Sequence, residues 1–317
     1  MSRLTRHVVL AAALGAAIAL GLALSANLPA TLEALRQFRW PLIPLVLAAV
    51  VTNWALRFLK WHLYLWRLGI PLPPGPSGLV FLGGFTMAIS PGKFGEVLKA
   101  LLVKNLVGTE ISRTASVVMA ERLTDVAGLL VLSGLGATAL PHGRLVLGAL
   151  TVLLVLAILV LRTPALARFA RRLLPEHRVI VELAEPLRLF LGAGRALVAP
   201  GILVLTIALS VVSWFFECLA FYLILEGFAV ALPLSVATVL YAFASLAGAL
   251  SMLPGGLGVA EASLTGLLVT FGTPLPLAAA ATLLIRVATL WLAVGLGVAT
   301  LGLAFHRRQA GATAHQD

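Results

Sequence analysis

The stretch AISPGKFGEVLKALLV, Ala88–Val103, puts two lysines, a glutamate and two glycines into a chain that is otherwise close to pure hydrocarbon. Pro91-Gly92 interrupt it, and each apolar piece beside them is shorter than the roughly 20 residues that a membrane-spanning helix needs. Broken backbone is tolerated at membrane depth only where protein or a wet cavity covers it. The stretch therefore predicts a re-entrant helical hairpin, at about 79–107, that turns inside a membrane.

The composition also indicates a chain that is embedded in lipid. Of its 317 residues, 61% are hydrophobic and 11% are charged, and the mean hydropathy is +1.06. So few charges cannot cover the surface of a soluble domain of this length. The formal net charge of +11 comes from basic residues beside apolar runs, which the positive-inside rule and anionic headgroups explain. We expect an integral membrane protein whose partners are membrane lipids and not nucleic acid.

The cysteine and histidine content argues against a metal centre. The single cysteine, Cys218, lies in an apolar run and has no second thiol to pair with. The six histidines are scattered, and none has the spacing of metal ligands. We expect no metal and no cofactor.

The apolar runs predict six full membrane spans in addition to the hairpin. These lie at about 8–26, 40–66, 114–140, 145–161, 197–225 and 277–305. A second interrupted segment, SMLPGGLGVAEASL, predicts another re-entrant hairpin at about 234–272. The first run also has features of a cleavable signal peptide, but it is long for one and more spans follow it.

The basic residues set the expected orientation. Placing both termini and the arginine-rich segment 163–196 in the cytosol puts most lysines and arginines on the inner side. This assignment holds only if both hairpins return to the side from which they enter. We therefore expect a multi-pass protein of the cell inner (cytoplasmic) membrane with both termini in the cytosol.

The chain is expected to form one all-α, polytopic membrane domain, 1–317. Its expected parts are a first span with an outer loop (8–39), a first repeat with a following span (40–162), a cytosolic linker with an interfacial helix (163–196), a second repeat (197–305) and a disordered tail (306–317). The linker is equally compatible with a plain cytosolic connection. The run TVLLVLAILVL within the first part of the chain offers an apolar face that suits either lipid or a homodimer contact.

Two halves of the sequence resemble each other. The pattern P-G-x-x-G, followed by a glutamate, occurs at Pro91 and again at Pro254. Further landmarks recur in the same order: Trp54 and Trp214, Arg57 and Glu217, and Arg122 and Arg286. With the orientation above, the first hairpin enters from the cytosol and the second from outside. This predicts two inverted repeats, an arrangement that places a substrate site near the membrane midplane.

The two interrupted turns predict a cavity where they meet. Their residues are Pro91, Gly92, Gly95, Pro254, Gly255, Gly256 and Gly258. Each turn begins a half-helix, whose N-terminus carries partial positive charge and free N–H donors. Lys93 adds a full charge in the first of them, so we expect a phosphate site that opens to the cytosolic leaflet.

Ionised residues inside apolar runs are the candidates for substrate binding. Each costs about 2.5–3.5 kcal/mol in a span, so such residues are normally paired and face inward. The candidates are Arg57, Lys93, Glu96, Glu121, Arg122, Asp125, Glu217, Glu261 and Arg286. The arginines suit a lipid phosphate, which guanidinium binds with two parallel hydrogen bonds. We expect Glu217 to neutralise Arg286, and Glu261, which has no cation nearby in sequence, to hold a proton or an amine.

Each candidate also has an interpretation that involves no substrate. Lys99 and Lys104 suit snorkelling toward the interface. Glu121, Arg122 and Asp125 suit a structural ion cluster, and Arg57 suits an interfacial belt with Trp61. The sequence contains none of the Ser-His-Asp, GxSxG, Walker or DxD patterns of common enzymes, so we expect a protein without catalytic residues.

Four motifs together resemble the lysylphosphatidylglycerol synthase transmembrane family, also called flippase-like integral membrane proteins. They are RFLKWHLYL, SPGKFGEVLKALLV, ERLTDVAGL and LPGGLGVAEASL, in family order. The resemblance implies translocation of a lipid between leaflets. It places Arg57, Lys93, Glu96, Glu121, Arg122, Asp125 and Glu261 at the family's polar motif positions. Only twelve residues follow Phe305, so an aminoacylated substrate would need a separate lipid-modifying enzyme as a partner.

The resulting hypothesis is a flippase or scramblase. It would move a phospholipid-like, aminoacylated or glycosylated headgroup through a polar cavity at the midplane. One alternative is a membrane transferase that acts on a lipid-linked substrate, with Glu96 or Asp125 as its base. Another is a transporter of a soluble solute, which would not require acyl chains.

Overall fold

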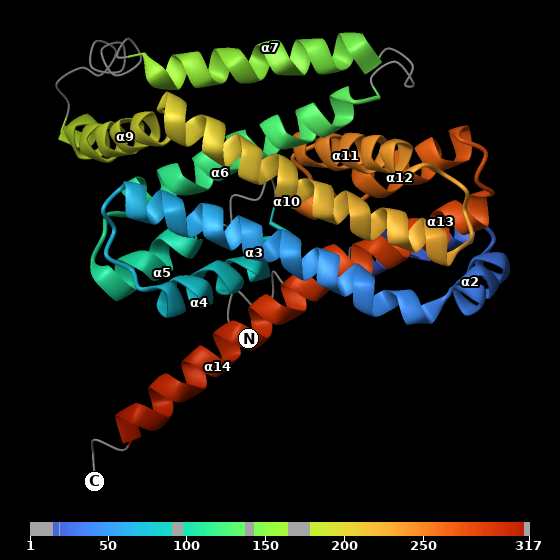
Figure 1. The fold of residues 1–317 in the computed structure, drawn as a ribbon. Helices are drawn as coiled ribbons and strands as arrows, with labels where there is room; N and C mark the ends of the chain where they lie inside the picture. Colours follow the sequence, from blue (N-terminus) through green and yellow to red (C-terminus); the bar gives the residue numbers. More distant parts are fainter. Residues whose placement is uncertain (1–14, 19, 91–97, 137–142, 164–177, 314–317) are drawn as a thin grey trace.

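The computed structural model describes residues 15–18, 20–90, 98–136, 143–163 and 178–313, and within these ranges the chain is helical and contains no strand. The helices labelled in Figure 1 are α2 (Leu28–Gln37), α3 (Ile43–Arg67), α4 (Pro74–Gly84), α5 (Leu98–Val107), α6 (Ile111–Gly134), α7 (Gly143–Arg162), α9 (Arg178–Leu197), α10 (Pro200–Gly227), α11 (Leu234–Leu250), α12 (Val259–Thr270), α13 (Leu275–Arg286) and α14 (Leu292–Thr313). Some of these helices are connected by short elements. These are the 3₁₀ turns η1 (Trp40–Leu42), η2 (Phe85–Met87) and η4 (Pro254–Gly256) and the π-helical segment η5 (Val287–Trp291).

Four segments in the described part of the chain are long and apolar enough to cross a membrane. They are Trp40–Arg67, Arg144–Arg162, Pro200–Gly227 and Leu275–Leu303. A fifth is present if Gly15–Ser25 and α2, which meet at a bend of 98°, form one span. The chain is therefore an integral, multi-pass, all-helical membrane protein. The expected span 114–140 corresponds to α6, which begins at Ile111 and ends at Gly134 and carries three ionised residues in its middle.

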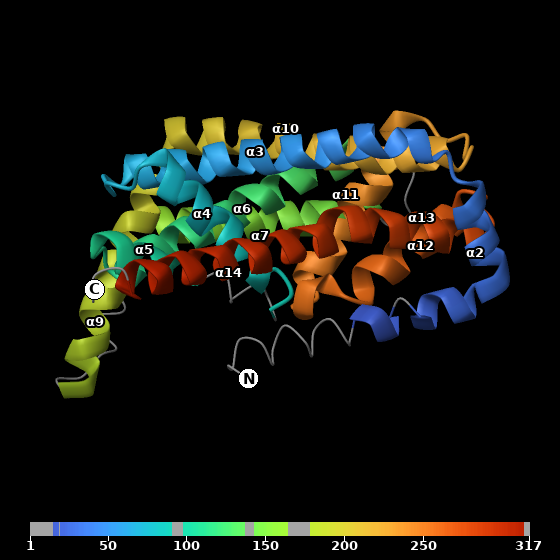
Figure 2. The same cartoon turned by 90° about the horizontal axis from the view of Figure 1, so that it is seen from below.

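The outer loop and the tail differ in detail from the expectation, whereas the linker contains a helix as expected. The expected outer loop contains α2, which begins after Asn27 because that side chain accepts a hydrogen bond from the Ala30 N–H. In the linker, α9 continues through Pro186 and leaves the bundle at a steep angle to α3 (Figure 2). The helix α14 continues through the expected disordered tail to Thr313, because Ala, Arg and Gln favour helix there.

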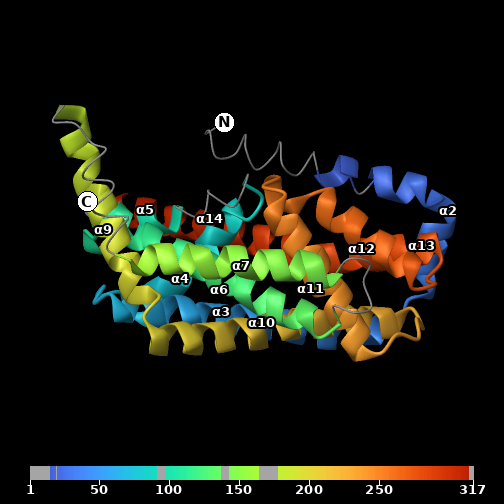
Figure 3. The same cartoon turned by 90° about the horizontal axis from the view of Figure 1, so that it is seen from above.

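Two antiparallel helices, α3 and α10, pack side by side along one face of the bundle (Figures 1 and 2). The N–H of Arg39, just before α3, donates to the carbonyl of Gly227 at the end of α10 (3.0 Å). Midway along both helices, Asn53 Nδ2 donates to the Ser213 carbonyl (2.7 Å). The helix α6 packs against α10, and α7 lies on the outer side of α6 (Figure 3).

The turns after α3 and α10 have the same backbone geometry. Gly69 and Ala229 both have a left-handed φ, of 63° and 55°. Their N–H groups donate to the carbonyls of Trp66 and Glu226, at 2.9 and 3.0 Å. Because an alanine rarely adopts a positive φ, its occurrence at Ala229 indicates that the turn itself is required.

The turns before α6 and α13 also correspond. Gly108 and Gly272, with φ of 72° and 86°, are each followed by a threonine and then, two residues later, by the start of the helix. Arg122 and Arg286 are both the twelfth residue of these helices. Arg122 and Arg286, which recur in the sequence, therefore follow similar turns at the same distance from the start of their helices.

Each hairpin is a pair of short helices that pack against each other. In the first, α4 packs with α5, and the tip, with Pro91, Gly92, Lys93, Gly95 and Glu96, lies outside the described residues. In the second, α11 packs with α12, and the chain reverses at η4. That reversal uses left-handed φ values at Gly255, Gly256 and Gly258 (61°, 66° and 87°), which glycine adopts without steric cost.

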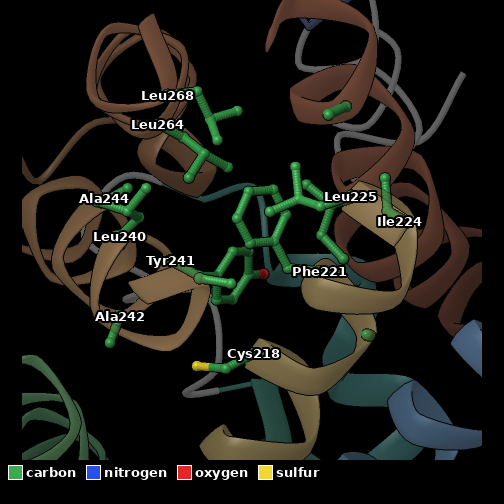
Figure 4. Close-up of a cluster of buried hydrophobic side chains, with 14 of the residues drawn as sticks. Cys218, Phe221, Ile224, Leu225, Leu240, Tyr241, Ala242, Ala244, Leu264 and Leu268 are labelled. Atoms are coloured by element: carbon green, nitrogen blue, oxygen red, sulfur yellow. The ribbon is translucent and has the colours of Figure 1, made fainter. Parts of the chain in front are cut away.

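The hairpins contact each other beside these glycines. A Cβ placed on Gly255 would lie 3.4 Å from Ile89 Cγ2, so the chain before the first tip packs directly on the second turn. The second hairpin is anchored by the hydrophobic core that Figure 4 shows, in which the rings of Phe221 and Tyr241 stack with centroids 5.4 Å apart. Leu264 and Leu268 of α12 complete this core.

We expect Gly256→Ala to destabilise the protein, whereas Gly266→Ala leaves it unchanged or more stable. At Gly256 a Cβ would meet the Gly248 backbone at 3.0 Å, and the left-handed φ alone costs about 1–2 kcal/mol. Gly266 lies in α12 with no atom within 4 Å of a new Cβ, so alanine there gains up to about 1 kcal/mol of helix propensity. Free energies of unfolding in detergent micelles measure both, and equal changes would contradict the packing at this turn.

Candidate functional site

A cavity of about 260 Å³ lies where α3, α6, α10, α11 and α13 approach the two hairpins. Its wall contains five of the predicted ionised residues, Arg57, Arg122, Asp125, Glu217 and Arg286, and two of the predicted glycines, Gly255 and Gly256. Four aromatic residues, Trp54, Phe85, Trp214 and Tyr241, line it as well. The fold therefore gathers residues that are up to 229 positions apart, from 57 to 286, around one space.

Asp125 is the centre of the most strongly charged wall. Its carboxylate is 5% exposed, and Lys60 Nζ donates to its Oδ1 (2.6 Å). The guanidiniums of Arg57 and Arg122 each lie 3.6 Å from its other oxygen, Oδ2. Among the described residues, three cations thus share this one carboxylate.

Lys60 completes this cluster from behind, although the sequence had suggested an interfacial role for its motif. Its ammonium is fully buried and also donates to Ser210 Oγ (2.6 Å) and Thr124 Oγ1 (3.3 Å). All three of its donors are used, so Lys60 holds Asp125 in place and does not face the cavity. Lys60 lies three residues after Arg57, so both are on one face of α3. This spacing was the sequence signal that could have identified Lys60 as part of the site.

Two donors near this wall have no acceptor among the described residues. They are the indole Nε1 of Trp214 and the Nε of Arg57, both inaccessible to solvent. Trp214 is 7% exposed and lines the cavity, and the Arg57 guanidinium lies 5.8 Å from its ring, in cation–π contact. Buried donors are normally satisfied, so this side of the cavity suits a ligand with anionic or carbonyl oxygens.

Two further carboxylates belong to the site, Glu217 in the cavity wall and Glu261 buried behind it. Tyr241 donates its hydroxyl to Glu217 (2.8 Å). Arg286 Nε donates to Glu261 Oε1 (2.6 Å), and its NH2 group donates to the Gly255 carbonyl (2.8 Å). We expected Glu217 to neutralise Arg286, but the ion pair of Arg286 is with Glu261.

Glu261 therefore differs from its expected role. The sequence offers it no cation, whereas the fold places Arg286 against it and buries it behind the cavity wall. Its second oxygen accepts from the Gly258 N–H (2.7 Å) at the start of α12. A carboxylate of the protein thus occupies the helix N-terminus where the sequence had predicted donors open to a phosphate.

Glu121 lies away from the cavity, in a second buried ion pair. Lys99 Nζ lies 2.6 Å from Glu121 Oε2 and 4.4 Å from the centre of the Trp61 ring. Lys99 therefore does not snorkel, because a carboxylate and an aromatic ring hold it inside the bundle. Lys104, at the end of α5, is exposed.

Comparison with known proteins gives one family over nearly the whole chain. Residues 8–297 match the family described as the lysylphosphatidylglycerol synthase TM region. A UPF0104 membrane protein of Methanothermobacter thermautotrophicus is 30% identical over 288 residues, which cover 84% of each chain. A second match of the same name and organism is 32% identical over 104 residues, or 32% of this chain and 30% of that protein. The chain belongs to the lysylphosphatidylglycerol synthase transmembrane-region family, and is a lipid-related integral membrane protein.

Proposed function

We propose that this protein is a flippase or scramblase that moves the headgroup of an anionic or phosphate-bearing lipid between leaflets through the cavity. The observation that carries the proposal is the wall around Asp125, where three cations share one carboxylate. Among the described residues that line the cavity, the three cations Arg57, Arg122 and Arg286 outnumber the two carboxylates Asp125 and Glu217 by one.

A phosphate suits this geometry for two reasons. The distance of 3.6 Å from Arg57 to Asp125 is too long for a hydrogen bond, and its Nε has no acceptor among the described residues, so this guanidinium retains donors for another oxygen ligand. Guanidinium binds phosphate through parallel hydrogen bonds, and such bonds gain strength away from water. The Trp214 N–H adds a neutral donor beside them.

We further propose that the helices form two inverted repeats with six full spans and two re-entrant hairpins. The antiparallel packing of α3 and α10 supports this, as do the matching turns after them. Asn53 and Ser213, which bond to each other, are 160 positions apart, the same separation as Trp54 and Trp214. Corresponding residues touch only near a symmetry axis, so a pseudo-two-fold axis would pass between them.

This arrangement suggests how access alternates. Rocking of one repeat against the other about the axis would expose the cavity first to one leaflet and then to the other. The positive-inside rule orients the protein in the cytoplasmic membrane with both termini in the cytosol. If the lipid is aminoacylated or glycosylated, a separate enzyme supplies it.

The proposal is tested by replacing one cavity arginine. We expect Arg57→Gln to lower the initial rate of translocation of fluorescent phosphatidylglycerol in proteoliposomes at least tenfold, because glutamine stays polar but is shorter and lacks the guanidinium charge that would hold the phosphate. Dithionite quenching of the outer leaflet measures the rate. Arg36→Gln is the matched control, since that side chain is 80% exposed on α2 and pairs only with Glu33 on the surface.

Two results would contradict the proposal. A wild-type rate in Arg57→Gln would remove the cavity from the transport path. A new lipid mass after incubation of the pure protein would favour the transferase. We expect the added lipid to be recovered unchanged, because Lys60 and two guanidiniums keep Asp125 ionised and occupied, which suits an anchor better than a catalytic base.

A further inference from the structure

The connection between α11 and η4 exposes large apolar side chains at the tip of the second hairpin. Leu250, Met252 and Leu253 are 45%, 51% and 44% exposed, and no ionisable residue interrupts them. We define Ala249–Leu253 as the tip strip. Exposed apolar residues are common in a membrane protein, so exposure alone does not distinguish this strip from the rest of the surface.

Continuity with the cavity does distinguish it. Ala249, Met252 and Leu253 of the tip strip also form part of the cavity wall. Leu145 of α7 and Val204 of α10, which are 74% and 69% exposed, are not part of it. The same side chains therefore meet both the polar space inside and the surroundings of the bundle, as the edge of an opening does.

The backbone of the tip strip is held in an unusual conformation. Met252 has a φ of 57°, a left-handed conformation that residues with a side chain rarely adopt. A hydrogen bond from the Leu253 N–H to Ser251 Oγ (3.3 Å) helps to fix it. Strain of this kind persists where the surrounding structure imposes it, and it is concentrated at functional sites. Here it lies at the place where the cavity meets the exterior.

The size of the cavity explains why an opening is needed. Pockets that enclose drug-sized ligands measure about 300–1,000 Å³, and this cavity measures about 260 Å³. It has room for a headgroup but not for a headgroup together with long hydrocarbon chains. An amphipathic lipid held by Arg57 and Arg122 must therefore extend its chains through an apolar gap in the wall.

We propose that the tip strip is a binding surface for the hydrocarbon chains of the lipid, with Met252 and Leu253 in contact with the chain as it leaves the cavity. This inference rests on the proposed function and adds the tail site to the headgroup site. It also makes chain length a determinant of the substrate, since a soluble headgroup would make none of these contacts.

Crosslinking tests the position of the chain. A phosphatidylglycerol with a diazirine in its acyl chain is bound to the full-length protein in nanodiscs and activated, and the adducts are located by mass spectrometry. We expect adducts within residues 249–253 that excess long-chain phosphatidylglycerol removes and dihexanoyl phosphatidylglycerol does not. Adducts that are confined to surfaces such as α7, with none in the tip strip, would overturn the inference.

A double substitution tests the role of the surface in transport. We expect Met252→Gln with Leu253→Gln to lower translocation of the long-chain lipid at least tenfold, because amide groups disfavour contact with hydrocarbon. Val204→Gln is the matched control. Wild-type translocation in the double variant would also overturn the inference. If the wild-type protein moves no lipid at all, the proposed function itself fails, and the two failures are thereby distinguished.

Discussion

Asp125→Asn is expected to lower the free energy of unfolding by about 3–5 kcal/mol, the usual cost of removing one partner from a buried ion pair. The substitution keeps the size of the side chain but removes the closest carboxylate of Lys60, which Arg57 and Arg122 also share. Lys60 is fully buried and cannot turn to water. Unfolding of the purified protein by SDS in mixed micelles, followed by circular dichroism, measures the change.

A surface carboxylate and a second substitution control this measurement. Glu33→Gln removes a carboxylate that is 54% exposed and pairs with Arg36, so we expect a change within about 1 kcal/mol. Lys60→Met in the Asp125→Asn background should restore part of the lost stability, because it removes the cation left without a partner. If Asp125→Asn costs no more than Glu33→Gln, Asp125 does not hold the three cations together.

The ion pair between Lys99 and Glu121 gives the second large effect. We expect Lys99→Met to lower the free energy of unfolding by about 3–5 kcal/mol, because Glu121, only 1% exposed, is left as a buried charge. The same SDS titration measures it. Lys104→Met is the matched control on the same helix, where the side chain is exposed and its loss should change stability by less than about 1 kcal/mol.

The double variant Glu121→Gln with Lys99→Met should lose less free energy of unfolding than the two single variants lose together, because no buried charge is left without its partner. We expect these substitutions to act through the stability of the fold and not through substrate binding, since neither Lys99 nor Glu121 lines the cavity. A Lys99→Met variant that folds as stably as Lys104→Met would place Lys99 at the interface, as the snorkelling interpretation had it.

The parts of the fold that the sequence predicted are those with local signals. The second hairpin was expected at about 234–272, and α11 and α12 occupy 234–270. A proline and three glycines mark its turn, and the glycines have the left-handed φ values that their residue type permits. Charges in hydrocarbon are equally conspicuous, and five of the nine candidate residues line the cavity.

The partners of those charges could not be predicted in the same way. Glu261 and Arg286 are 25 positions apart, and Lys99 and Glu121 are 22 apart, so only the packing of separate helices brings them together. Lys60 stood in a motif rich in aromatic and basic residues, a pattern that is also typical of a membrane interface. Burial decides between the two interpretations, and burial is a property of the whole fold.

The contact between Asn53 and Ser213 has a consequence for how such a chain would originate. If the two halves descend from one duplicated gene, the ancestral half-length protein inserted in both orientations and paired head to tail. Position 53 then faced its own copy, so a single residue had to serve as donor and acceptor at once. Once the halves are separate in sequence, the two positions can differ, and here an asparagine amide donates to the backbone carbonyl of a serine.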